Sequence, residues 1–139
     1  MFRIDPMSRV PIYEQIKTQL ERFILTGTIA PGEQIPSVRS MSLELSVNPV
    51  TILKAYSELD SDGLIQSVPG RGYFVCESAH EAMLKKKSKL LDSVADMACE
   101  LALAGIPKDA VIERIGEAYR ASHDKHKVMN ERDNSDDKS

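Results

Sequence analysis

Polar and positively charged residues between positions 37 and 72 have the types and the spacing that contact with DNA requires. Arg39 can donate a bidentate pair of hydrogen bonds to a phosphate or to a guanine edge, and Lys54 and Arg71 add positive charge. N–H groups at helix starts near Ser37 and Asn48 can hold phosphates. The residues that we expect to contact DNA are Ser37, Arg39, Asn48, Pro49, Val50, Thr51, Lys54, Gly70, Arg71 and Gly72.

Two helices joined by a tight turn must position most of these residues. Ser37 can cap a helix that runs to about Ser46, and Asn48 can cap the next one, with Pro49 at its first position. Apolar residues of the second helix recur at i, i+3, i+4 and i+7 and define its buried face: Ile52, Ala55, Tyr56 and Leu59. The opposite face then presents Asn48, Val50, Thr51 and Lys54. This order is typical of a helix-turn-helix, whose second helix fits the major groove.

A β-hairpin, or wing, is predicted to follow these two helices. Residues 64–68 and 73–77 have the pattern of short strands, and the glycines between them indicate a tight turn with Arg71 at its tip. There Arg71 would reach the neighbouring minor groove or the DNA backbone. Upstream, a helix from Pro11 to Gly27 completes the domain, and residues 1–7 are expected to be a loose lead-in. We therefore predict a mainly α fold with a small β-hairpin, with a winged helix-turn-helix DNA-binding domain over residues 8–78.

Residues 79–127 are predicted to form two amphipathic helices, separated by Gly105 and Pro107. Their apolar stripe is too wide for two helices to bury alone, whereas two copies of the chain would form a four-helix bundle. The alternative is that both helices fold back onto their own winged helix. The residues expected at the dimer seam are Met83, Leu90, Leu91, Val94, Met97, Leu101, Val111, Ile115 and Tyr119. Residues 128–139 are polar and charged and are predicted to be a disordered tail.

The composition limits the class of protein. The net charge is −3 and the pI about 5.6, although many nucleic-acid binders are basic. Local charge matters more, because screening limits its reach to about 10 Å, and residues 34–57 contain only Arg39, Glu44 and Lys54 as charged residues. Neither an export signal nor a membrane-spanning run is recognisable. Cys76 and Cys99 match no motif, so we expect reduced core thiols in a cytoplasmic protein.

No pattern of residues indicates an enzyme, a metal site or a cofactor. A glycine-rich phosphate loop before a helix is absent, as is a nucleophile with a correctly spaced base. His123 and His126 have a spacing that metal ligands use, but no third ligand accompanies them, so a polar helix end is the preferred interpretation. Four lysines behind the hairpin could contact phosphates, although a solvated helix face is preferred: Lys85, Lys86, Lys87 and Lys89.

The motifs between Val10 and Glu77 resemble those of the GntR family of winged helix-turn-helix regulators, in order and in spacing. They are Pro11-Ile12-Tyr13, Gln15-Ile16, Gly27-x-Ile29-x-Pro31-Gly32, Ile35-Pro36-Ser37-x-Arg39, Val47-Asn48-Pro49-x-Thr51, Ala55-Tyr56-x-x-Leu59, Gly63-Leu64-Ile65 and Gly70-Arg71-Gly72-Tyr73-Phe74-Val75. The helical part that follows is too short for the ligand-binding or enzyme domains of larger members. It resembles the short YtrA-like subgroup, whose two C-terminal helices pair two subunits.

The resemblance also implies which residues touch operator DNA: Ser37, Arg39, Thr51, Lys54, Gly70 and Arg71 occupy the corresponding positions. Two residues depart from the pattern of the family. Pro49 stands where many members have an arginine, and Val50 stands where close relatives often have a polar residue. The operator sequence therefore does not follow from a relative, and Val50 is able to meet a thymine methyl instead.

The sequence thus predicts a dimeric, sequence-specific transcriptional regulator, more specifically a repressor, that binds a palindromic operator in double-stranded DNA. The resemblance implies autoregulation of an operon, often one that encodes a membrane transporter. We expect no cofactor, and an unidentified small-molecule effector would have to fit a small pocket. The alternative is a winged-helix protein–protein interaction module without DNA binding. Arg39, Lys54 and Arg71 favour DNA, because all three are cations on the surface where an acidic partner would lie.

Overall fold

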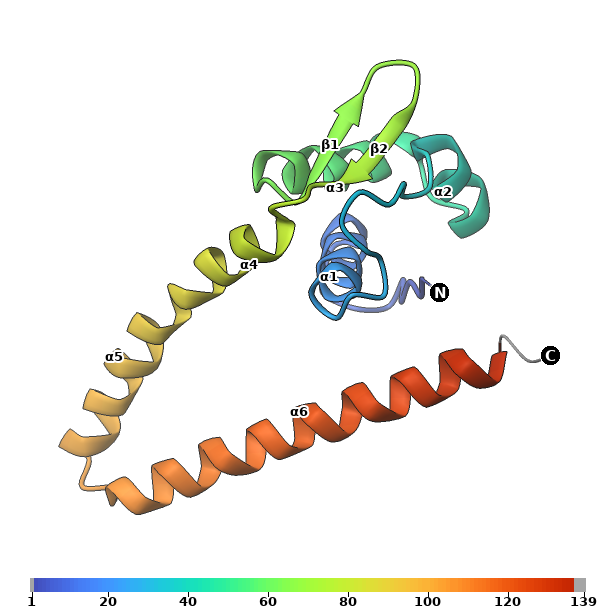
Figure 1. Cartoon of the computed structure of the whole chain (residues 1–139). Coiled ribbons are helices and arrows are strands. Elements are labelled where there is room, and N and C mark those ends of the chain that lie inside the picture. Colours follow the sequence, from blue (N-terminus) through green and yellow to red (C-terminus); the bar gives the residue numbers. More distant parts are fainter. Residues whose placement is uncertain (1, 137–139) are drawn as a thin grey trace. The chain divides into compact units, whose positions relative to one another are not determined.

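The computed structural model describes residues 2–136, with side chains placed as far as residue 124. The chain divides into two compact units, Met1–Lys89 and Leu90–Ser139. The first unit contains α1 (Ile12–Leu25), α2 (Val38–Leu45), α3 (Pro49–Ser61), β1 (Ile65–Val68), β2 (Gly72–Val75) and α4 (Ala79–Ser88), and the second contains α5 (Leu90–Leu103) and α6 (Lys108–Asp136) (Figure 1). Within the described residues, no helix has the length and apolar character needed to cross a membrane.

The starts of α2 and α3 confirm both predicted caps. The Ser37 hydroxyl accepts a hydrogen bond from the Ser40 N–H at 3.0 Å, and the side-chain oxygen of Asn48 accepts one from the Val50 N–H at 2.9 Å. Each bond satisfies a backbone donor that the helix itself leaves free. Pro49 occupies the first helical position, where its missing N–H costs nothing. The local sequence therefore fixes where α3 begins.

A left-handed residue and a side-chain hydrogen bond form the turn between α2 and α3, and a second side-chain hydrogen bond ties α3 to the segment before α2. Ser46 ends α2 with φ of 54°, a conformation that few non-glycine residues adopt. The Ser42 hydroxyl donates to the Val47 carbonyl at 2.6 Å and closes the turn. The buried Tyr56 of α3 donates from its hydroxyl to the Pro36 carbonyl at 2.6 Å. These contacts hold α3 against the segment that leads into α2.

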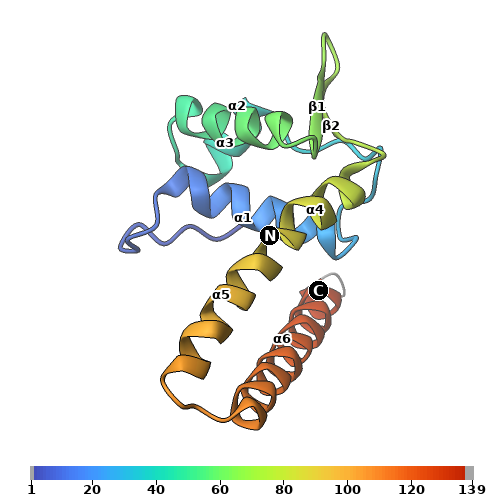
Figure 2. The same cartoon turned by 90° about the vertical axis from the view of Figure 1, so that its left-hand side faces the viewer.

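The hairpin is antiparallel, and its register pairs Ile65 with Val75, Gln66 with Phe74, Ser67 with Tyr73 and Val68 with Gly72. A segment that the sequence indicates only as an irregular connector adds to this sheet, because Gln34 forms an isolated bridge with Phe74. The Ile35 N–H donates to the Tyr73 carbonyl at 3.0 Å. In both views the hairpin extends away from α1 and past α3 (Figures 1 and 2).

The core of the first unit lies between α1, α2, α3, the hairpin and α4. All four residues expected on the buried face of α3 are in it, with zero exposure. The buried core residues are Phe2, Ile16, Leu20, Ile24, Ile29, Ile35, Met41, Ile52, Ala55, Tyr56, Leu59, Leu64, Ile65, Val75, Ala79 and Met83. Aliphatic side chains predominate, in keeping with the low aromatic content of the sequence.

The expectation of a loose lead-in over residues 1–7 is wrong for the residues described. The Phe2 side chain is buried, and its ring meets Phe23 edge to face with centroids 5.4 Å apart. The Arg3 N–H donates to the Gln19 side chain at 2.9 Å, and the Asp5 N–H donates to the Gln15 side chain at the same distance. The side chains of two glutamines in α1 thus bind backbone N–H groups of the N-terminal segment and hold this segment along the helix.

The predicted boundary at residue 78 also needs correction, because α4 belongs to the winged-helix unit. Ala79 and Met83 are buried against it, with Met83 only 1% exposed. Lys86 of α4 lies 3.1 Å from Glu21 of α1 and 2.9 Å from Asp62, the residue after α3. Met83 is therefore a core residue and not part of a dimer seam, and Lys86 is an ion-pair partner and not a freely solvated charge.

The second unit consists of α5 and α6, joined around Gly105 as the sequence predicts. The helix α6 continues to Asp136, past the expected end at Lys127, and no proline interrupts it. Residues 137–139 of the expected tail lie outside the described residues. Cys99 is exposed in the single chain and does not form part of a core, whereas Cys76 is half-buried. Burial and the nearby Asp60 raise the pKa of the Cys76 thiol.

Candidate nucleic-acid interface

The outward face of α3 is a stripe formed by Val50, Leu53, Lys54 and Ser57, at i, i+3, i+4 and i+7. It lies opposite the buried stripe that anchors the helix. Val50 is 72% exposed and Leu53 is 45% exposed. Thr51 lies at the border of the stripe and is half-buried. The stripe thus combines a cation and a hydroxyl with two large apolar side chains.

Lys54 has a defined position on this face. Its ammonium lies 3.9 Å from the centroid of the Tyr13 ring, which comes from the start of α1. A cation over an aromatic ring is attracted by the negative face of the π-system. Burial, Glu14 and Glu58 raise the pKa of the Tyr13 hydroxyl. The Tyr13 contact therefore restrains Lys54 beside the outward face of α3.

Arg39 lies in the first turn of α2 and is exposed. Ser37 and Asn48, also exposed, use one side-chain oxygen each to cap α2 and α3. The amide group of Asn48 can still donate to a partner while its oxygen acts as the cap. The N-termini of α2 and α3 each carry a partial positive charge, which adds to the charge of Arg39.

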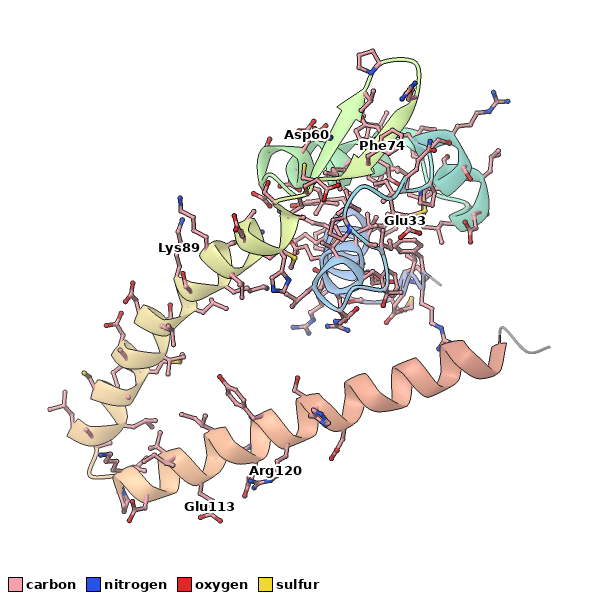
Figure 3. All side chains as sticks on the ribbon, viewed as in Figure 1. Glu33, Asp60, Phe74, Lys89, Glu113 and Arg120 are labelled. Carbon is pink, nitrogen blue, oxygen red and sulfur yellow. The ribbon has the colours of Figure 1, made fainter. Side chains whose placement is uncertain are left out.

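Arg71 is exposed at the tip of the wing, between two glycines with positive φ. Gly70 has φ of 77° and Gly72 has φ of 113°, values at which a side chain would strain the backbone. The Gln34 side chain donates to the Arg71 carbonyl at 2.7 Å and ties the tip to the connector before α2. Figure 3 shows Phe74 on β2 below this tip. The wing is thus positioned by contacts beyond its own two strands.

Sequence reasoning missed three residues of this surface. Leu53 is not among the ten residues expected to contact DNA, although it has helical spacing with Val50. Tyr13 and Gln34 support Lys54 and Arg71 from distant parts of the chain. No local pattern indicates such contacts. The ten residues expected at the DNA surface all lie in the first unit, on α2, α3, their caps and the wing.

The second unit has its own unusual surface, an apolar face shared by α5 and α6. Every side chain among residues 90–124 is at least partly exposed in the single chain. Most of the predicted seam residues are exposed, and Leu101 and Val111 are half-buried. A hollow of about 480 Å³ between the helices is lined by Val94, Met97, Ala98, Leu101, Ile106, Ala110, Val111, Arg114 and Ile115. Glu113 and Arg120 project from α6 on the side away from α5 (Figure 3).

Over the residues whose side chains are placed, no group of three His, Cys, Asp or Glu side chains could hold a metal ion. His126, half of the pair considered in the sequence, lies outside those residues.

Comparison with known proteins agrees with the geometry. Residues 12–75 match the model of bacterial regulatory proteins of the gntR family. The chain is 35% identical over 118 residues to the HTH-type transcriptional repressor YtrA of Bacillus subtilis, an alignment that covers 84% of this chain and 91% of that protein.

Two solved structures extend the comparison. A GntR family transcriptional regulator from Listeria monocytogenes is 32% identical, with a TM-score of 0.65, over 82% of this chain and 98% of that one. YtrA from Sulfolobus acidocaldarius, a GntR-family transcription factor, is 35% identical, with a TM-score of 0.54, over 68% of this chain and 97% of that one. On its winged-helix architecture and on this similarity over nearly the whole length of a relative, the chain belongs to the GntR family of bacterial regulatory proteins.

Proposed function

We propose that this protein is a homodimeric transcriptional repressor that binds a palindromic operator by placing α3 in the major groove. The observation that carries the proposal is the outward stripe of α3, which contains Lys54, lies opposite the buried face of the helix and is accompanied by the exposed Arg39 and Arg71. An α-helix fits the major groove, and cations beside it neutralise phosphates. The similarity to a repressor over most of the chain supports the repressor role.

The caps and the turn support this use of α3. A recognition helix must hold its orientation while its outer side chains approach base edges. Here the Tyr56 hydroxyl bonds the Pro36 carbonyl, and Asn48 fixes the helix start. The hydrogen bond from Gln34 holds the main chain of Arg71 in place, and the Arg71 side chain can then contact the DNA backbone or the minor groove. In this proposal, the cations supply affinity and the α3 stripe supplies sequence discrimination.

The apolar face of α5 and α6 supports the dimer. Large apolar side chains that a single chain leaves exposed on two helices are covered when two copies form a four-helix bundle. The proposed seam consists of Leu90, Leu91, Val94, Met97, Leu101, Val111, Ile115 and Tyr119. A twofold dimer would place two α3 helices about one DNA turn, roughly 34 Å, or a multiple of it apart. That spacing requires a palindromic site.

The hollow between α5 and α6 would receive side chains of the second copy in this arrangement. Its lining is apolar except for Arg114. An apolar effector would compete for the same space, so effector binding there would oppose dimer formation. This coupling is the form of regulation that the second unit best supports.

The proposal is tested by selecting duplexes from a random library with the full-length protein and sequencing the bound molecules. We expect two inverted half-sites at a fixed separation. Arg39→Ala and Lys54→Ala should each weaken binding to the selected duplex. Each should also reduce the dependence of log affinity on log salt by about one unit, since each removes about one phosphate contact.

Arg22→Ala is the matched control, because Arg22 is an exposed arginine in the last turn of α1. It should leave both the affinity and the salt dependence unchanged. Failure to enrich any duplex would favour the rival function, a winged helix that binds only proteins. If the affinities of wild type, Arg39→Ala and Lys54→Ala depend equally on salt, neither Arg39 of α2 nor Lys54 of α3 contacts a phosphate, and the proposed DNA surface is wrong.

A further inference from the structure

The two apolar side chains on the outward face of α3 are not explained by the core of the protein. Val50 and Leu53 are one turn apart, and both lie opposite the buried stripe. The hydrogen-bonding side chains of the same stripe are limited to Lys54 and Ser57. A helix that read bases through hydrogen bonds alone would place donors or acceptors at positions 50 and 53.

The major groove contains one apolar group that such residues can recognise. Thymine carries a 5-methyl group there, whereas guanine, cytosine and adenine present donors and acceptors. Pressing leucine or valine against a polar base edge removes water from that edge without replacing its hydrogen bonds, which is unfavourable. The same side chains against a methyl group bury apolar surface on both sides.

We propose that Val50 and Leu53 read the methyl groups of thymines at two neighbouring base pairs of each operator half-site. This inference rests on the proposed DNA-binding function and specifies the sequence class that α3 selects. Residues three apart in a helix are separated by about 4.5 Å along its axis, and successive base pairs by about 3.4 Å. One side chain per neighbouring base pair is therefore compatible with the spacing. Leu53 would thus be a specificity-determining residue in addition to those that the sequence predicts.

The flanking charges support DNA as the occupant of this apolar surface. The ammonium of Lys54, on the same stripe, lies over Tyr13 at 3.9 Å. Arg39 and Arg71 are exposed on α2 and on the wing. A protein partner that covered Val50 and Leu53 would also have to neutralise these cations, which the phosphates beside a groove do directly. The surface thus combines an apolar centre with a cationic surround.

The test replaces thymine by uracil, one position at a time, in a duplex selected by the full-length protein. Uracil lacks the 5-methyl group and keeps the same hydrogen-bonding edge. Affinity is measured by fluorescence anisotropy at fixed salt. We expect uracil at two neighbouring positions of each half-site to weaken binding about fourfold per methyl removed, and uracil elsewhere to have no effect.

Leu53→Gln should abolish the preference for thymine over uracil at one of these two positions and keep it at the other. Val50→Ser should give the reciprocal result. Leu25→Gln is the matched control, since Leu25 is 38% exposed and lies at the end of α1, about 18 Å along that helix from Tyr13. It should preserve the full pattern. All three side chains are partly exposed, and thermal unfolding of each variant checks that the fold persists.

Two results would overturn the inference without affecting the proposed function. In one, a duplex is selected and bound tightly, yet uracil is accepted at every position. In the other, the thymine preference exists but persists in Leu53→Gln and Val50→Ser, so other residues read the methyl groups. Failure to select any duplex would instead contradict DNA binding itself.

Discussion

The ammonium of Lys54 lies 3.9 Å from the centroid of the Tyr13 ring, so a side chain of α1 positions a cation of α3. The Tyr13 ring packs against the core of the first unit, and its hydroxyl is 3.3 Å from the Glu14 carboxylate. Lysine has a flexible side chain, and ordering it on binding costs conformational entropy. A lysine already restrained in the free protein loses less freedom when it meets a phosphate.

Tyr13→Leu should therefore weaken operator binding by about two- to fivefold, the effect of losing an exposed cation–π contact. Tyr13→Phe keeps the ring and should bind like wild type. Fluorescence anisotropy with the selected duplex measures both variants. If Tyr13→Phe binds as weakly as Tyr13→Leu, the hydroxyl and not the ring is the important group, and Tyr13 itself touches DNA.

Tyr56→Phe should lower the free energy of unfolding by about 1–3 kcal/mol, because the Pro36 carbonyl loses its partner in a partly buried place. Tyr73→Phe is the control. The Tyr56 and Tyr73 rings meet edge to face with centroids 5.0 Å apart, and this substitution preserves both the rings and the Tyr56 hydrogen bond. Denaturant unfolding compares the two variants. An equal loss in both would mean that the Pro36 contact adds nothing to stability.

The acid side of the stability profile should depend on Asp62. Burial alone would raise the pKa of Asp62, but hydrogen bonds from Lys86 and Lys17 outweigh it and lower the pKa. A carboxyl group with a lowered folded-state pKa stabilises the fold above its unfolded pKa of about 3.9. This contribution is lost as the pH falls through the lower, folded-state value.

Asp62→Asn should consequently be less stable than wild type at pH 7, and the difference should shrink as the pH falls below about 4. Asp60→Asn, at an exposed aspartate in the last turn of α3, should leave the acid side of the stability profile unchanged. Denaturant unfolding at a series of pH values gives the comparison. A difference between Asp62→Asn and wild type that stays constant down to pH 2 would exclude the ion pairs as its source.

The elements that the sequence predicts well are those fixed by local chemistry. Ser37 and Asn48 cap helices because their side chains reach backbone donors two or three residues ahead. The buried face of α3 follows from helical spacing alone. Such features need no knowledge of distant residues, and the structure agrees with the predicted caps and with the buried face.

Elements that depend on distant partners were missed. Phe2 belongs to a short N-terminal segment without helical or strand periodicity, and only the fold brings it to Phe23. Lys86 belongs to a run of lysines typical of a solvated surface, yet it pairs with Glu21 and Asp62. The helical pattern of residues 79–102 does not reveal that α4 covers α1 while α5 belongs to the second unit. In each case the sequence indicates the local conformation but does not indicate which distant residue or helix is the partner.

The proposed dimer makes the last prediction, which concerns Val94 of α5. Val94 lines the apolar hollow between α5 and α6. An aspartate in a seam covered by a second copy would bury a charge without a partner, which is strongly unfavourable. Val94→Asp should therefore be monomeric by sedimentation. It should also bind the full operator about a hundredfold more weakly, because the second half-site no longer adds avidity.

Arg120→Asp is the control for this substitution, since it places a new carboxylate on the side of α6 that points away from α5 (Figure 3). It should remain dimeric and bind the operator as wild type does. A single half-site separates the two effects of Val94→Asp: the variant should bind it as tightly as wild type, because its α3 is intact. A Val94→Asp protein that still sediments as a dimer would place the interface away from this face, and the rival arrangement, with α5 and α6 against their own winged helix, would then account for the apolar stripe.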